Sequence, residues 1–425
     1  MMRKITAILL LIIIMVSLTS CYDANEIDNV LHVTAIGVDQ GISDKWRLTL
    51  QFSTMKESGG GGGESQSGGG ASKGEYTFVT IDAPSFFTGI NMLDASLPRR
   101  LSFIHAQTII FSEELAKSGL IGEYIAPISR FREIRRSSHV LVIKGKASEF
   151  LEENQPFIGT MLSKNFQIMI GESKNTGFFP HVTLEHFYTW LKSSYSQPIA
   201  TLAAVNDFEA FKKEGEPWGT QFNTGGNYTA GELPRTGENK IELFGTALFD
   251  GDTMVGELNG DETRYMLMVR GEFKRGFFTM QDPKKPEVII PLDVKSAAKP
   301  EIKVTFADTK PIINVKIGLD ADILAIQSGI NYEQPELKSL LEETFTQSVV
   351  EGINKVIEKC QDLNTDVFLF GAHASRSFLT IDELEDYNWN SRFKDAEITV
   401  EVEFAIRRTG TQIDNHSIND SEGAE

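Results

Sequence analysis

The amino-acid sequence predicts an α+β fold of three mixed domains, each a mostly antiparallel or mixed sheet with packed helices, behind an N-terminal signal peptide. Alternating apolar and polar residues indicate half-buried strands, and apolar residues three and four positions apart indicate amphipathic helices. Stretches that contain glycine and proline separate these segments. With 41% hydrophobic and 24% charged residues, a chain of 425 residues can bury a core in each domain.

The first 20 residues are expected to be a lipoprotein signal peptide. Arg3 and Lys4 precede an apolar stretch, Ala7–Val16, that is too short to span a bilayer. The following sequence, Leu18-Thr19-Ser20-Cys21, resembles a bacterial lipobox, in which the cysteine thiol receives a diacylglycerol. We therefore expect Cys21 to be the lipid attachment site and the first mature residue, held on the bilayer by two acyl chains. The alternative is an ordinary secretory signal with a chance cysteine.

Residues 21–198 are expected to form an N-terminal α/β domain. Two strands, 46–53 and 76–81, flank the glycine-rich segment 58–72, which we interpret as an elongated hairpin loop because closure entropy grows slowly with loop length. The patterns that follow predict strands at 103–111 and 139–143, and helices at 113–132, 157–170 and 183–191.

Two further domains and a tail are expected after residue 198. A middle domain, 199–297, contains strand patterns at 241–249 and 288–292. A C-terminal domain, 298–410, has the clearest periodicity, with strands at 302–306, 313–323 and 398–406 and one long amphipathic helix over 337–360. The polar tail, 411–425, is expected to be disordered.

Composition limits the possible partners. A net charge of −18 argues against binding to nucleic acid. The two cysteines are Cys21 and Cys360, and Cys360 falls on the apolar stripe of the predicted long helix, where a small buried side chain is expected. No apolar run after the signal reaches 18 residues, so no further transmembrane helix is predicted.

Catalytic and metal-binding patterns are weak. A serine acyl-enzyme needs S-x-x-K at the start of a helix, but Ser53-Thr54-Met55-Lys56 follows a predicted strand. The two later motifs of that class are matched only loosely, by Ser163-Lys164-Asn165 and Arg408-Thr409-Gly410. His181 and His186 are five residues apart, which does not place them on one helix face. We therefore expect no catalytic residues, no metal and no cofactor.

A cluster of arginines stands out on this acidic chain. Arg130 and Arg132 lie at the end of the predicted helix 113–132, Arg135 and Arg136 follow it, and Arg99 and Arg100 precede it. One interpretation is a helix C-terminus whose cations face the negative end of the helix dipole. The other is a contact site for a partner or for lipid phosphates.

Several segments together resemble a known family. They are Cys21-Tyr22-Asp23, Glu26-Ile27-Asp28, Ile36–Asp39, Arg99–Phe103, Glu113–Ala116, Arg130–Arg135, Gly245–Phe249, Val255–Leu258, Cys360–Gly371, Trp389 and Arg408–Gly410. Their order and spacing resemble the Ger(x)C lipoproteins, the C subunits of the nutrient germinant receptors of bacterial endospores. The chain departs from the pattern at Tyr22, where the family often has Trp, and in the long glycine-rich segment. Its turn Asp366–Gly371 is also looser than the usual D-x-F-G-F-G.

The resemblance implies a three-domain, non-enzymatic lipoprotein on the outer face of the spore inner membrane. It would be anchored there through its diacylglyceryl cysteine and would work with the membrane-embedded A and B subunits to sense nutrients and start germination. Two alternatives stay open. A solute-binding lipoprotein would show two similar lobes and a hinge, and a serine acyl-enzyme would depend on Ser53.

Overall fold

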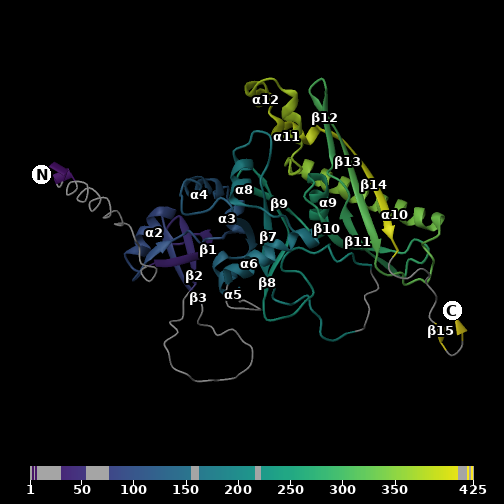
Figure 1. Cartoon of the computed structure of the whole chain (residues 1–425), viewed down its shortest axis with the longest axis horizontal. Coiled ribbons are helices and arrows are strands. Elements are labelled where there is room, and N and C mark those ends of the chain that lie inside the picture. Colours follow the sequence, from purple (N-terminus) through teal and green to yellow (C-terminus); the bar gives the residue numbers. More distant parts are fainter. Residues whose placement is uncertain are drawn as a thin grey trace.

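The computed structural model describes residues 30–53, 76–154, 162–215 and 222–409, with a few isolated residues near each terminus. Two sheets and their helices form the molecule (Figure 1), which confirms the predicted α+β class. Cys21, the glycine-rich segment 58–72 and almost all of the tail 411–425 lie outside the described residues. Within the described ranges, no helix is long and apolar enough to cross a membrane.

The first sheet has nine strands, in the order β3-β2-β1-β5-β6-β7-β8-β9, with β4 beside the start of β1. Strands β1, β5, β6 and β7 are parallel to one another, and antiparallel strands flank them on both sides. The bounds are β1 (Val30–Gln40), β2 (Trp46–Ser53), β3 (Tyr76–Ala83), β4 (Arg100–Ser102), β5 (Thr108–Ser112), β6 (His139–Lys144), β7 (Ile199–Val205), β8 (Ile241–Asp250) and β9 (Thr253–Leu258).

Both faces of the first sheet are covered. Ile109 and Ile110 are neighbours on β5, and they belong to two separate buried clusters, one on each face. This double burial explains why β5 is buried at every position instead of alternating. The helices of this half are α2 (Phe86–Asp94), α3 (Glu113–Lys117), α4 (Ile121–Ile128), α5 (Ala147–Glu153), α6 (Leu162–Gly171), α7 (Ser173–Thr176) and α8 (Leu184–Leu191).

Two predicted elements of this half were wrong in extent. The helix expected at 113–132 is divided into α3 and α4, because Gly119 has a left-handed φ of 73° that a helix cannot continue through. The strand expected at 103–111 begins only at Thr108. Residues 103–106 form a turn instead, in which Ala106 N donates to Phe103 O at 2.9 Å.

The second sheet has five strands: β10 (Arg275–Gln281), β11 (Ile289–Ser296), β12 (Glu301–Ala307), β13 (Lys310–Ile323) and β14 (Glu397–Arg408). One side of β13 pairs with β12 and β11, and the other side pairs in parallel with β14 along nearly its whole length. The strict alternation seen in the sequence is confirmed, since the buried side chains of β13 follow every second position.

The long predicted helix is also confirmed as α10 (Pro335–Asp362), which buries its apolar stripe against the second sheet. Cys360 is fully buried on that stripe, as expected. The other helical segments of this half are α9 (Gly260–Arg270), α11 (Phe370–Ala374), α12 (Ile381–Tyr387), α13 (Trp389–Arg392) and two short 3₁₀ turns, Ser375–Ser377 and Phe393–Asp395.

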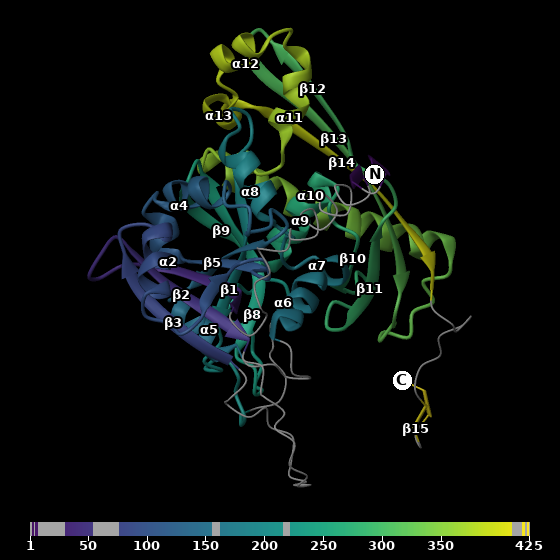
Figure 2. The same ribbon diagram turned by 60° about the vertical axis from the view of Figure 1, so that its left-hand side comes forward.

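The region predicted as a middle domain contributes to both sheets. Strands β7, β8 and β9 complete the first sheet, whereas β10 and β11 belong to the second. Figure 2 shows α9 and α10 lying between the two sheets. The domain boundaries 199–297 therefore stay a prediction. The strands within them are divided between the first and the second sheet.

A buried turn fixes the segment after α10. The Asp366 carboxylate accepts hydrogen bonds from the backbone N–H groups of Phe368, Phe370 and Gly371 and from Trp389 Nε1 at 2.9 Å. A side chain at Gly371 would come within 2.1 Å of Tyr195 O. This turn belongs to the motif Cys360–Gly371 noted in the sequence, and its geometry explains why a small residue is needed at Gly371.

Candidate functional site

Of the arginines singled out in the sequence, Arg130, Arg132, Arg135 and Arg136 lie on turns and irregular backbone after α4, and none of them is in the helix. The last turn of α4 contains no basic residue, and the helix ends at Ile128. Phe131 packs inward and Ile134 is only 5% exposed, whereas Arg130 and Arg132 point outward and are exposed. The helix-dipole interpretation is therefore wrong, and these charges are available to a partner.

Ring contacts hold this segment against two others. Phe131 packs edge-on against Phe87 of α2, at 5.4 Å between ring centroids, and against Phe103, at 5.9 Å. The carboxylate of Glu133 accepts a hydrogen bond from Phe103 N at 2.9 Å. Because Phe103 directly follows β4, the structure brings Arg130 and Arg132 close to Arg99 and Arg100, which are also exposed.

We call the exposed residues of these segments the basic surface, and they are Arg99, Arg100, Arg130 and Arg132 with Phe87, Met92 and Ile104. The three apolar side chains are 41–42% exposed, which is unusual for residues of this size. In the part of the chain that the structure describes, none of the four arginines forms an ion pair. Their charge is thus open to solvent.

Arg135 and Arg136 lie farther along the same segment, beside the start of α8. The carbonyl oxygen of Arg136 accepts a hydrogen bond from Glu185 N at 3.0 Å. Both side chains are exposed. They extend the positive charge of this end of the molecule, but no contact links them to Arg99 or Arg100.

The N-terminal segment enters the fold at the basic surface. Val30, the first residue of β1, pairs with Arg100 in the parallel β1–β4 ladder. Val30 lies nine positions after Cys21 in the sequence. An extended chain of nine residues spans at most about 30 Å.

Two histidines that sequence analysis did not connect lie close to Arg136. The rings of His139 and His181 are 4.9 Å apart, and Nδ1 of His139 is buried without a hydrogen-bond partner among the described residues. Burial, with a smaller contribution from His181, lowers the pKa of His139 to about 4. His186 instead stacks on Trp190. No group of three or more possible metal ligands occurs within the described ranges.

The motifs of the serine acyl-enzyme hypothesis are only partly visible. Ser53 ends strand β2, as the sequence indicated, and does not begin a helix. Lys56 and Gly410 lie outside the described residues, as do the side chains of Ser163 to Asn165. The structure thus places the first serine in an unsuitable element for that mechanism.

Two family models match the sequence in succession. Residues 23–205 match "Spore germination protein N-terminal domain", and residues 244–410 match "Spore germination B3/ GerAC like, C-terminal". The chain belongs to the GerAC family of spore germination proteins. The family resemblance inferred from the sequence motifs is thereby confirmed.

Curated relatives match this GerAC-family protein over nearly their full length. Spore germination protein YndF of Bacillus subtilis (strain 168) is 23% identical over 96% of this chain and 98% of the relative. Spore germination proteins B3 and KC of the same organism are each 20% identical, over 93% and 96% of this chain and 96% and 97% of the relatives. These names describe germination proteins, and none of them names a catalysed reaction.

A solved structure shares the fold. The crystal structure of the GerBC protein is similar with a TM-score of 0.51, over 88% of this chain and 96% of that chain, at 15% identity. At this identity the likeness concerns the fold alone, and it supports the two-sheet α+β architecture described above.

Proposed function

We propose that this GerAC-family protein is a lipid-anchored, non-enzymatic subunit of a nutrient germinant receptor. It lies on the outer face of the spore inner membrane and works there with the membrane-embedded A and B subunits. The full-length likeness to spore germination proteins supports the germination role. The lipobox ending at Cys21 supports the anchor.

One observation carries the membrane part of this proposal. Val30, nine positions after Cys21, pairs with Arg100, and nine extended residues span at most about 30 Å, which supports a basic surface near the proposed lipid site. Arginines near an anionic leaflet each contribute about 1 kcal/mol to binding. Exposed Phe87, Met92 and Ile104 add apolar side chains of the kind that enter the headgroup region. The basic surface therefore faces the bilayer in this proposal.

The anchor is tested by replacing each cysteine in turn in the spore-forming host. Cys21→Ala is expected to remove the protein from the inner-membrane fraction and to slow germination in response to nutrients. Cys360→Ala is the matched control, because Cys360 is buried and has no place in the anchor. A Cys21→Ala protein that stays in the membrane and supports normal germination would contradict the anchor.

The receptor assignment needs a separate experiment. A tag placed after Gly410 allows the protein to be recovered from gently solubilised spore membranes, and mass spectrometry then identifies what accompanies it. Two multi-span membrane proteins are expected in the recovered complex. Recovery of the lipoprotein alone would instead favour an independent solute-binding protein, although the two sheets of this structure differ in strand number and order and do not form two similar lobes.

A further inference from the structure

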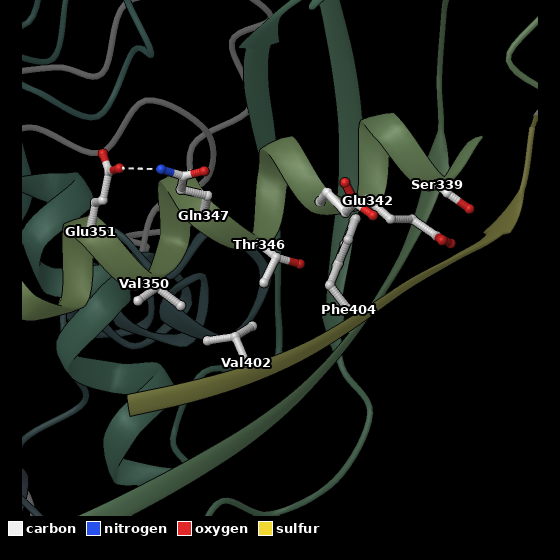
Figure 3. Close-up of a pocket in the computed structure, with 9 residues that line it drawn as sticks. Ser339, Glu342, Thr346, Gln347, Val350, Glu351, Val402 and Phe404 are labelled. Atoms are coloured by element: carbon white, nitrogen blue, oxygen red, sulfur yellow. Dashed lines mark hydrogen bonds between the residues drawn. The ribbon is translucent and has the colours of Figure 1, made fainter. Parts of the chain in front are cut away.

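A groove with a volume of about 590 Å³ lies between one flank of α10 and strand β14. The helix contributes residues at three- and four-residue spacing from Ser339 to Glu351, and the strand contributes Val402 and Phe404. Figure 3 shows Thr346 and Val350 of the helix pointing toward these two strand residues. The groove is about 18 Å long at 1.5 Å per helical residue.

The floor of the groove is apolar and fixed by the core. Val402 is 7% exposed, and the Phe404 ring lies 4.5 Å from the buried ring of Phe345. Val350 is partly buried beside them. A ligand that lies in the groove must therefore offer apolar side chains to this floor.

The rim is acidic. Glu343 and Glu351 are exposed, and Glu343 forms no ion pair within the described ranges. Glu351 accepts a hydrogen bond from Gln347 at 2.9 Å, which leaves its negative charge uncompensated. Glu342 closes one end, where Lys338 lies 3.9 Å away. A complementary ligand carries positive charge.

The strand that borders the groove has an open edge. β14 pairs with β13 only, so its other edge has no strand partner in the part of the chain that the structure describes. Ile406 N points away from β13 and donates to Glu342 Oε1 at 2.8 Å. Backbone direction repeats every second residue, so Phe404 and Val402 also present their N–H and C=O groups toward the groove.

A second copy of this chain does not fit that edge. Glu397, Glu401 and Glu403 are exposed along β14. Lys310 and Lys316 of β13 pair with these carboxylates from one side, but pairing two β14 edges would bring the carboxylates of the two copies together, and like charges on adjacent strands are destabilising. The edge therefore disfavours self-association and favours a chain of opposite charge.

We propose that the groove binds an extended, basic segment of a partner protein, which adds as a strand to the open edge of β14. Apolar side chains of that segment pack on Val350, Val402 and Phe404, and alternate Lys or Arg side chains meet Glu343 and Glu351. About five extended residues fill the groove at 3.3 Å per residue. This binding site is independent of the lipid anchor and goes beyond the proposed function.

The test uses the full chain in mild detergent and a fluorescent nonapeptide of alternating lysine and valine. Binding is followed by anisotropy. The double variant Glu343→Lys, Glu351→Lys is expected to weaken binding at least fivefold. Its matched control, Glu358→Lys with Glu385→Lys, changes the net charge equally at exposed sites outside the groove and is expected to change affinity less than twofold.

Two control peptides test the charge and the backbone conformation of the bound segment. A peptide of alternating glutamate and valine is expected not to bind, because the rim repels it. A lysine–valine peptide with two of its valines replaced by proline is expected to bind at least fivefold more weakly, because proline cannot donate a backbone hydrogen bond to the β14 edge.

Several results would overturn the proposal. Equal loss of binding in the two double variants would mean that only overall charge attracts the peptide. Undiminished binding of the proline peptide, or a helical circular-dichroism signal from the bound peptide, would exclude strand addition. A concentration-dependent dimer that disappears in the Glu343→Lys, Glu351→Lys variant would show that a second copy occupies the groove.

Discussion

The basic surface and the acidic groove lie toward opposite ends of the molecule (Figure 1), and they are built in different ways. The arginines of the basic surface stand on turns or at strand ends, above a cluster of phenylalanine rings, and lack ion pairs among the described residues. The acids of the groove stand on a regular helix and beside a regular strand edge. The basic surface has no regular spacing of charges, which is compatible with a broad partner such as lipid headgroups. The charges of the groove are regularly spaced, which is compatible with one extended chain bound in a fixed register.

The largest expected effect tests whether the groove is part of the core. Phe345→Ala removes a side chain that is 3% exposed and that contacts Phe404 and Phe278. We expect the free energy of unfolding to fall by about 3 kcal/mol, measured by chemical denaturation. Phe277→Ala is the control. Phe277 precedes Phe278 on β10 but is 59% exposed, so its truncation should lower the free energy of unfolding by less than about 0.5 kcal/mol. Equal effects would contradict a rigid groove floor.

The second prediction separates the two ends by their partners. In the proposed mature polypeptide without lipid, Arg130→Ser with Arg132→Ser should weaken binding to vesicles that contain phosphatidylglycerol by roughly thirtyfold, at about 1 kcal/mol per arginine. Stability should not change, because both side chains are exposed and unpaired among the described residues. Vesicle sedimentation measures the effect.

The matched control for that pair is Lys212→Ser with Lys213→Ser, which removes the same charge at exposed positions outside the basic surface. If both double variants lose vesicle binding equally, only the net charge of the protein determines its affinity for the vesicles, and the basic surface is not a specific membrane contact. If the Glu343→Lys, Glu351→Lys variant alters vesicle binding as strongly, the contrast between the two ends is lost.

A smaller effect is expected where Glu342 holds the strand edge. Glu342→Gln removes the negative charge from the acceptor of the Ile406 N–H bond, which should lower the free energy of unfolding by up to about 1 kcal/mol. Amide hydrogen exchange at Ile406 should become faster, and exchange at Val315 in the paired strand β13 should not change. Unchanged exchange at Ile406 would show that this donor does not depend on Glu342.

A pH effect also distinguishes the two ends. No histidine lines the groove, whereas the pKa of His139, at the start of β6 in the first sheet, is about 4 in the folded protein and about 6.5 in the unfolded chain. Between these values the unfolded chain binds a proton that the folded protein excludes. Stability from this group is therefore complete above pH 6.5 and is lost as pH falls toward 4.

His139→Gln should reduce the decline in unfolding free energy between pH 7 and pH 5, measured by denaturation at each pH. Burial also lowers the pKa of His181, so part of the decline in unfolding free energy persists in the variant. An identical decline in the wild type and the variant would show that His139 is not held neutral by the fold.

The sequence predicted the second sheet better than the first. Strands β12, β13 and β14 face a core on one side only, so their apolar residues alternate visibly. β7 (Ile199–Val205) is buried at nearly every position and shows no alternation, and it was missed.

Helix α9 was missed because Arg264, only 2% exposed, interrupts its apolar stripe. Its guanidinium lies 3.6 Å from the Phe178 ring centroid, a contact that only the tertiary fold creates.

The two candidate sites were predictable to different degrees. The arginines were visible as a local cluster, but Phe87 joins them only through its ring contact with Phe131, and Ile104 follows Phe103, whose ring also contacts Phe131. Likewise, His139 and His181 are distant in sequence and meet because Thr183 bridges to the start of β6. The groove depends on an unpaired strand edge, and pairing across β13 and β14 is not encoded in the local pattern of either strand.

One consequence follows from the position of β8. It follows the N-terminal family match, which ends at residue 205, yet it pairs with β7 and continues the first sheet. A protease cut between residues 206 and 240 would therefore leave two fragments that stay associated through the backbone hydrogen bonds between β7 and β8. A fragment that ends at residue 205 would instead expose an apolar edge and tend to aggregate. The first sheet therefore joins strands from both family-matched regions in one continuous ladder.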